Sequence, residues 1–104
     1  MLDYLEILHT PSITEPDEQE ILENEDALFT TVVTGKPEPT VEWFHGFTKL
    51  RPSDTVIIDN VGDRYSLQLR NCQLEDTGSI TVAAFNKAGS NSADTALIVK
   101  GKTT

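Results

Sequence analysis

Short runs of hydrophobic residues, each closed by polar turn residues, follow one another along most of the chain. The segment 65–70 shows the pattern most clearly, because Tyr65, Leu67 and Leu69 alternate with polar residues. Alternation with a period of two places one side of a strand in a core and the other side in solvent. The same pattern predicts further strands over residues 27–33, 40–44, 55–58, 79–85 and 92–99. Turns recur at intervals of about 8–12 residues, which is typical of an all-β sandwich or barrel.

The two ends of the chain carry weaker signals. Residues 1–10 are interpreted as a lead segment or interdomain linker, although Leu2, Leu5 and Leu8 have the spacing of one helical turn. In the acidic stretch that follows, residues 20–22 are predicted to begin an edge strand, whose charges discourage pairing with another sheet. We therefore predict one domain over residues 11–100 and a polar tail over residues 101–104.

Composition limits the possible functions. The chain has 104 residues, which suit a single domain, and a formal net charge of −9. That charge disfavours nucleic acid and anionic membranes as partners, since both require clusters of Lys and Arg. No apolar run approaches the ~18 residues that a membrane span needs, and the first residues are acidic where a signal peptide is basic. The single Cys cannot close a disulfide within the chain.

Several turn motifs occur in an order that resembles a known family. A Gly-Lys-Pro-Glu-Pro segment from Gly35 precedes Trp43, Asp76-Thr77-Gly78 follows the strand at Leu67-Gln68-Leu69, and Asn86-Lys87-Ala88-Gly89 closes the next strand. Together these residues resemble the intermediate set, or I-set, of immunoglobulin-like domains over most of residues 11–100. The resemblance implies a sandwich of two antiparallel sheets, with turns marked by Gly35, Asp76, Gly78, Asn86 and Gly89. It also implies a core built from Phe29, Val33, Trp43, Leu67, Leu69, Ile80 and Val82.

The chain departs from the family at three positions. Thr31 and Val82 stand where the cysteines of the inter-sheet disulfide are expected, and Ile80 stands at the tyrosine position of the corner before the second cysteine. A crosslink closing ~50 residues would contribute roughly 4 kcal/mol in the chain-entropy model, so core packing has to compensate for its absence. Loss of the disulfide costs nothing in the reducing cytosol, which favours an intracellular protein. The pattern resembles modules of giant muscle proteins of the titin, twitchin, obscurin and myosin-binding protein C type.

This resemblance implies a non-catalytic structural and protein-interaction module of a giant sarcomeric or cytoskeletal protein, acting as a spacer, an elastic element or a docking site. Its expected partners are neighbouring immunoglobulin-like or fibronectin-like modules and other sarcomeric or cytoskeletal proteins. We expect the isolated domain to be a monomer located in the cytoplasm, in the sarcomere or myofibril. In the family, pulling on the termini shears the first and last strands apart, here residues 20–23 and 95–99. A Leu97→Pro change should therefore lower the unfolding force. The alternative is a recognition module of an adhesion or receptor ectodomain without its disulfide.

Few residues suggest chemistry of their own. Cys72 lies next to acidic residues, which raise the pKa of a thiol, so we interpret it as a structural Cys that becomes a redox site only if the domain opens. His45 has no third partner with which to form a nucleophilic group, and neither His9 nor His45 has the spacing of zinc ligands. The acidic segment 15–26 suits calcium or, alternatively, a basic partner. We predict no enzymatic activity, no cofactor and no resident metal.

Overall fold

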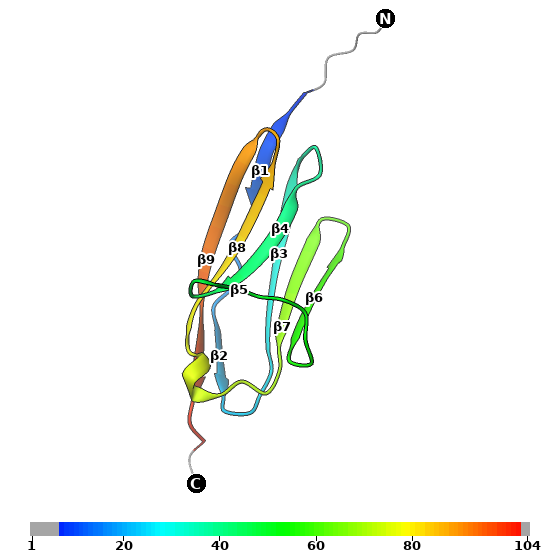
Figure 1. The fold of residues 1–104 in the computed structure, drawn as a ribbon. Coiled ribbons are helices and arrows are strands. Elements are labelled where there is room, and N and C mark those ends of the chain that lie inside the picture. Colours follow the sequence, from blue (N-terminus) through cyan, green and yellow to red (C-terminus); the bar gives the residue numbers. More distant parts are fainter. Residues whose placement is uncertain (1–6, 103–104) are drawn as a thin grey trace, which may run out of the picture.

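The computed structural model describes residues 7–102, which form two β-sheets packed face to face (Figure 1). The four-stranded sheet has the order β1 (His9–Ile13), β3 (Ala27–Lys36), β7 (Arg64–Leu69), β6 (Val56–Val61). The five-stranded sheet has the order β2 (Gln19–Leu22), β9 (Gly89–Lys100), β8 (Gly78–Asn86), β4 (Thr40–His45), β5 (Thr48–Lys49). A single 3₁₀ turn, η1 (Leu74–Asp76), joins β7 to β8 in the described part of the chain. The arrangement confirms the predicted all-β sandwich.

The first two strands belong to different sheets. β1 pairs with β3 in the four-stranded sheet, and after residues 14–18 the chain crosses over so that β2 pairs with β9 in the other. The β2–β9 pairing is parallel, whereas the other strand pairs are antiparallel. The described chain enters at one end of the sandwich and leaves at the opposite end, so a pull on the termini runs along the strands (Figure 1).

The core lies between the sheets and is centred on Trp43, which is 1% exposed. Strand alternation turns one side of each strand inward, and the residues on those sides form one hydrophobic cluster. All seven residues expected in the core are buried: Phe29, Val33, Trp43, Leu67, Leu69, Ile80 and Val82. Six of them, all but Val33, belong to the cluster, which also includes Cys72, Leu97 and Val99 toward the end where the described chain leaves.

The two positions expected to hold the disulfide cysteines are buried, although neither residue is a Cys. Val82 is fully buried in the hydrophobic cluster. Thr31 is 3% exposed, and its hydroxyl donates to the carbonyl oxygen of Thr14. A buried polar group without a partner would cost roughly 1–3 kcal/mol, so this hydrogen bond allows a Thr to occupy the position. The only Cys of the chain, Cys72, is free.

The structure corrects some of the predicted boundaries. Gly35 does not mark a turn but lies inside β3, which continues to Lys36. A side chain at Gly35 would come within 2.9 Å of the ring of Pro39 and 3.2 Å of the Pro11 backbone, so the close approach of neighbouring segments explains the Gly. Gly78 likewise begins a strand, β8. β1 begins at His9, two residues before the predicted domain start, and neither β1 nor β5 was predicted.

Replacing Trp43 tests the central contact. The indole Nε1 has no hydrogen-bond partner among the described residues, so Trp43→Phe removes ring surface but breaks no hydrogen bond within that region. We expect Trp43→Ala to lower the free energy of unfolding by about 3–5 kcal/mol and Trp43→Phe by less than half of that. Urea unfolding followed by circular dichroism measures both values. Equal losses for the two variants would contradict packing as the main role of the ring.

Candidate functional site

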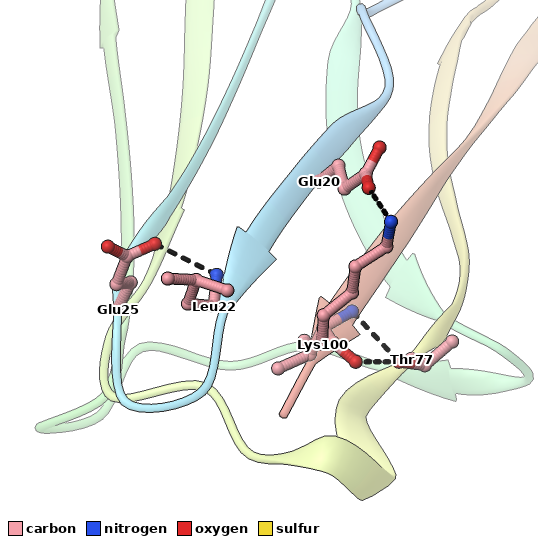
Figure 2. Close-up of polar contacts among 6 residues, drawn as sticks. Glu20, Leu22, Glu25, Thr77 and Lys100 are labelled. Carbon is pink, nitrogen blue, oxygen red and sulfur yellow. Dashed lines mark hydrogen bonds and ion pairs between the residues drawn. The ribbon is translucent and has the colours of Figure 1, made fainter. Parts of the chain in front are cut away.

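The edge formed by β2 and β9 joins the first part of the chain to its last strand. Four residue pairs define the parallel register, from Gln19 opposite Leu97 to Leu22 opposite Lys100. The ammonium of Lys100 forms an ion pair with the carboxylate of Glu20 across the two strands (Figure 2). This contact raises the pKa of Lys100, chiefly through the side-chain hydrogen bond with Glu20. Both side chains are at least half exposed, so the pair adds little to stability in water.

Hydrogen bonds continue this edge into the end of the sandwich where the chain leaves. The N–H of Leu22 donates to Glu25 Oε1 at 2.8 Å, and the N–H of Glu23 donates to the carbonyl oxygen of Lys100 at 2.8 Å. On the other side of β9, Thr77 Oγ1 accepts from the N–H of Val99 at 3.0 Å (Figure 2). The last residues of β9 are therefore held from both sides.

The turn after β2 is also tied to the segment before η1. The N–H of Asn24 donates to the carbonyl oxygen of Cys72 at 2.8 Å, and the N–H of Cys72 donates to the carbonyl oxygen of Glu25 at 2.9 Å. Asp26 Oδ1 accepts from the N–H of Asn71 at 2.9 Å. Asn24 and Asn71 have positive φ values of 75° and 53°, a conformation that Asn tolerates better than most residues. Two turns that are distant in the sequence thus form one hydrogen-bonded unit, as expected where buried backbone groups need partners.

At the opposite end, two Asn side chains hold β1. Asn86 Nδ2 donates to the carbonyl oxygens of His9 and Pro37, both at 2.9 Å. Its Oδ1 accepts from the N–H groups of Ala88 and Gly89, which closes the β8–β9 turn. Asn91 Nδ2 donates to the carbonyl oxygen of Pro11 at 3.2 Å. One side chain, Asn86, therefore connects the first strand, the β3–β4 connection and the β8–β9 turn.

Cys72 and His45 line the same hollow of about 200 Å³, beside Asp76. Each of the two side chains is hydrogen-bonded to a backbone carbonyl group rather than to the other, so His45 does not activate the thiol. Cys72 Sγ donates to the carbonyl oxygen of Leu69 at 3.4 Å, and His45 Nε2 donates to the carbonyl oxygen of Asp76 at 2.8 Å. Burial, followed by the negative charge of Asp76, raises the pKa of the Cys72 thiol. The protonated, 1% exposed thiol is a structural core residue in this conformation.

Several carboxylates of the acidic segment have structural roles rather than a shared ligand. Glu20, Glu25 and Asp26 contact Lys100, Leu22 and Asn71 in the interactions described above. Glu15 and Asp17 line shallow hollows beside the crossover between β1 and β2. Among residues 7–102, no group of three or more Asp, Glu, His or Cys side chains is placed to hold a metal ion. The structure therefore offers no ligand set for the calcium hypothesis within that range.

Comparison with known proteins identifies the family. The model of the immunoglobulin I-set domain matches residues 11–99. The chain belongs to the immunoglobulin I-set family. The I-set interpretation from the turn motifs is thus confirmed, together with the two-sheet fold and the absence of the inter-sheet disulfide.

Muscle proteins are among the relatives of this I-set chain. It is 34% identical over 84 residues to the muscle M-line assembly protein unc-89 of Caenorhabditis elegans, a match that covers 80% of the chain and 1% of that protein. It is 33% identical over 87 residues to smooth muscle myosin light chain kinase of Gallus gallus, covering 84% of the chain and 5% of the kinase. The chain thus spans a very small part of these relatives, and the kinase name describes a much longer protein.

A solved structure with the same fold is the complex of titin M10 with an obscurin-like 1 immunoglobulin domain. One chain of that complex superimposes with a TM-score of 0.86 and 26% sequence identity, covering 92% of this chain and 99% of that one. No helix within residues 7–102 is long and apolar enough to cross a membrane.

The sequence predicted β2, β8 and β9 of this site but neither β1 nor the side chains that fasten the strands. Asn86 was expected only to mark a turn, and Asn91 and Thr77 were given no role as hydrogen-bonding residues. The one available signal was Asn86 followed by Gly89, because Asn side chains often bond to the backbone of a turn. Nothing in the sequence indicates that the same amide reaches His9.

The Cys72 contacts predict a thiol that reacts only when the domain unfolds. In buffer at pH 7.5, iodoacetamide should label the folded chain more than about a hundredfold more slowly than the urea-unfolded chain, because opening is rare in a stable domain. A Ser90→Cys, Cys72→Ser variant carries its thiol at an exposed position of β9 and supplies the fast reference in the folded state. Labelling of Cys72 at the rate of that reference would contradict its structural role.

Proposed function

We propose that this chain is a force-bearing spacer module within a string of modules in a giant intracellular muscle or cytoskeletal protein. The observation that carries the proposal is the parallel pairing of β2 with β9 in a sandwich that the described residues enter at one end and leave at the other (Figure 1). Neighbouring immunoglobulin-like or fibronectin-like modules would continue the string on both sides.

The geometry determines how such a module responds to a pull. Tension on the N-terminal side reaches β1 and then β2, whereas tension on the C-terminal side enters β9 directly. Because β2 and β9 run parallel and are pulled in opposite directions, their hydrogen bonds lie across the direction of pull and load together. Several bonds must then break at once, which gives a high unfolding force. The Asn86 and Asn91 contacts to β1 add resistance at the other end.

Two further observations support an intracellular muscle protein. The chain builds its core without a disulfide, so a reducing compartment costs it no stability. Its relatives include the muscle M-line assembly protein unc-89 and smooth muscle myosin light chain kinase. The solved titin M10 complex supports recognition of a second immunoglobulin domain as a further role for modules of this type.

Proline substitutions in β2 test the force path. The N–H of Glu23 faces β9, since it donates to Lys100. Alternate N–H groups of a strand point to the same side, so the N–H of Ile21 also faces β9 while that of Glu20 points away. Ile21→Pro should lower the unfolding force in single-molecule pulling by roughly a third or more, because Pro removes a ladder donor.

Glu20→Pro is the matched control, since it removes an N–H that does not face β9. It should change the unfolding force much less than Ile21→Pro, although it loses the ion pair with Lys100. This comparison is sharper than Leu97→Pro, because Leu97 is fully buried in the core whereas Ile21 is only partly buried against it. An unchanged force for Ile21→Pro, or equal losses for both variants, would exclude β2–β9 shear as the main barrier.

A further inference from the structure

Each sheet of the sandwich has two edge strands, whose outer backbone groups face no neighbouring strand. The edges are β1 and β6 in the four-stranded sheet and β2 and β5 in the five-stranded sheet. An open edge can pair with an extended segment of another molecule, so folded proteins usually cover, shorten or charge their edges. An edge that is left open therefore indicates where such a segment can add.

Three of the four edges are protected. Asn side chains of β8 and β9 cover the carbonyl groups of His9 and Pro11 on β1. At the end of β2, Leu22 is bonded through both its N–H and its C=O to Glu25, and the charge of Glu20 guards the middle of the strand. β5 has only two residues.

The outer side of β6 is defined by the bonds at its first residues. The carbonyl oxygen of Thr55 accepts from the N–H of Arg70 at 2.8 Å, so Thr55 faces β7. Alternate residues direct their backbone groups to the same side, so the odd-numbered residues of β6 face β7 and the even-numbered residues face away. Val56 accordingly bonds to Ser53 outside the sheet, through both its N–H and its C=O.

The next even-numbered residues of β6 leave three backbone groups open. The N–H and C=O of Ile58 and the C=O of Asn60 have no hydrogen-bond partner among residues 7–102. The N–H of Asn60 donates to Asp59 Oδ1 at 2.8 Å. Because Ile58 and Asn60 are two residues apart, the open groups lie in line, as pairing with a further strand requires. Figure 1 shows β6 as the outermost strand beside β7.

The side chains of β6 restrict which segment fits beside it. Ile57, Asp59 and Val61 share the outward side of the strand. The alternate residues Val56 and Ile58 pack against the core from the inner side. Val61 is 78% exposed, and no Lys or Arg within residues 7–102 forms an ion pair with Asp59. An added segment with apolar side chains beside Ile57 and Val61 and a basic one beside Asp59 is thus favoured, whereas an acidic segment is repelled.

We propose that the outer edge of β6 binds an extended segment of a partner protein, in which a Lys or Arg stands between two apolar residues at a spacing of two. The segment adds to the four-stranded sheet as a fifth strand, antiparallel to β6. Its backbone bonds to the open groups of Ile58 and Asn60, and its basic side chain pairs with Asp59. The proposal goes beyond the spacer role, because it gives the module a partner at its side in addition to its neighbours along the string.

A synthetic peptide with blocked ends and the sequence Thr-Val-Thr-Lys-Val-Val-Thr provides the probe. Its Lys lies opposite Asp59, and the Val that follows the Lys lies opposite Ile58. Titrated into the whole chain, it should move the amide NMR shifts of β6 and slow hydrogen exchange of the Ile58 N–H, with a Kd on the order of 1 mM.

Two N-methylated peptides test whether the backbone of the peptide pairs with β6. Methylation of the Val opposite Ile58 removes the N–H that meets the Ile58 carbonyl group, and it should weaken binding roughly fivefold. Methylation of the Lys is the matched control, because the N–H of that residue points away from β6.

An exchange of charges tests Asp59. Asp59→Lys should weaken binding of the peptide roughly fivefold or more, and a peptide with Glu in place of its Lys should restore it. Glu75→Lys makes the same change of net charge at an exposed position of η1 and should change binding much less. Circular dichroism checks that both variants are folded.

Four results would each overturn the proposal. They are β6 shifts that do not move at millimolar peptide, shifts confined to the acidic segment 15–26, equal weakening by the two methylations, and equal weakening by the two Lys variants. None of them bears on the force path, because the pairing of β2 with β9 lies in the other sheet. The spacer proposal can therefore fail or stand separately.

Discussion

The two sheets are held together mainly by packing around Trp43. Most immunoglobulin domains reinforce that contact with a disulfide, whereas here Thr31 and Val82 occupy its positions. Burial of one large aromatic side chain removes ~150–250 Å² from water, which at about 25 cal/mol per Å² is comparable with the roughly 4 kcal/mol of a crosslink. Each inward position must therefore be filled by a side chain that packs closely, and the hydroxyl of Thr31 needs its hydrogen bond to Thr14.

Because no covalent link joins the sheets, the contacts at the two ends of the sandwich matter more for holding its strands together. A crosslink would keep the two cysteine-bearing strands attached even after the end strands had separated. In this chain only noncovalent contacts hold the strands together, and hydrogen bonds from side chains and turns reinforce them at the two ends of the sandwich. Asn86 and Asn91 fasten β1 at one end, while Thr77 and the turn after β2 hold the last residues of β9 at the other. The same hydrogen-bonded turn encloses Cys72, so the protection of the thiol and the mechanical integrity of that end have one physical cause.

How far the sequence predicts this structure depends on the range of the interactions. The alternation at Tyr65, Leu67 and Leu69, and the single Trp, were enough to predict the strands and the centre of the core, because strand periodicity is local. Gly35 was misplaced because the reason for it lies in Pro11 and Pro39, which approach it only in the folded chain. The hydrogen bond from Asn86 to His9 joins residues 77 positions apart and has no local pattern. The side chains that fasten the ends could therefore be found only in the structure.

Charged residues are distributed differently along the β2 edge and on the outward side of β8. Glu20 and Glu25 lie along the β2 edge, where a carboxylate satisfies a backbone N–H or a Lys and also discourages another sheet from pairing. On the outward side of β8, which lies inside the sheet and so has no free backbone groups, the residues are small or aromatic. Beside them Glu42 forms an ion pair with Lys49, and Asp94 accepts a hydrogen bond from Thr81. Negative charge along the β2 edge thus protects the pairing of β2 with β9 from a competing strand.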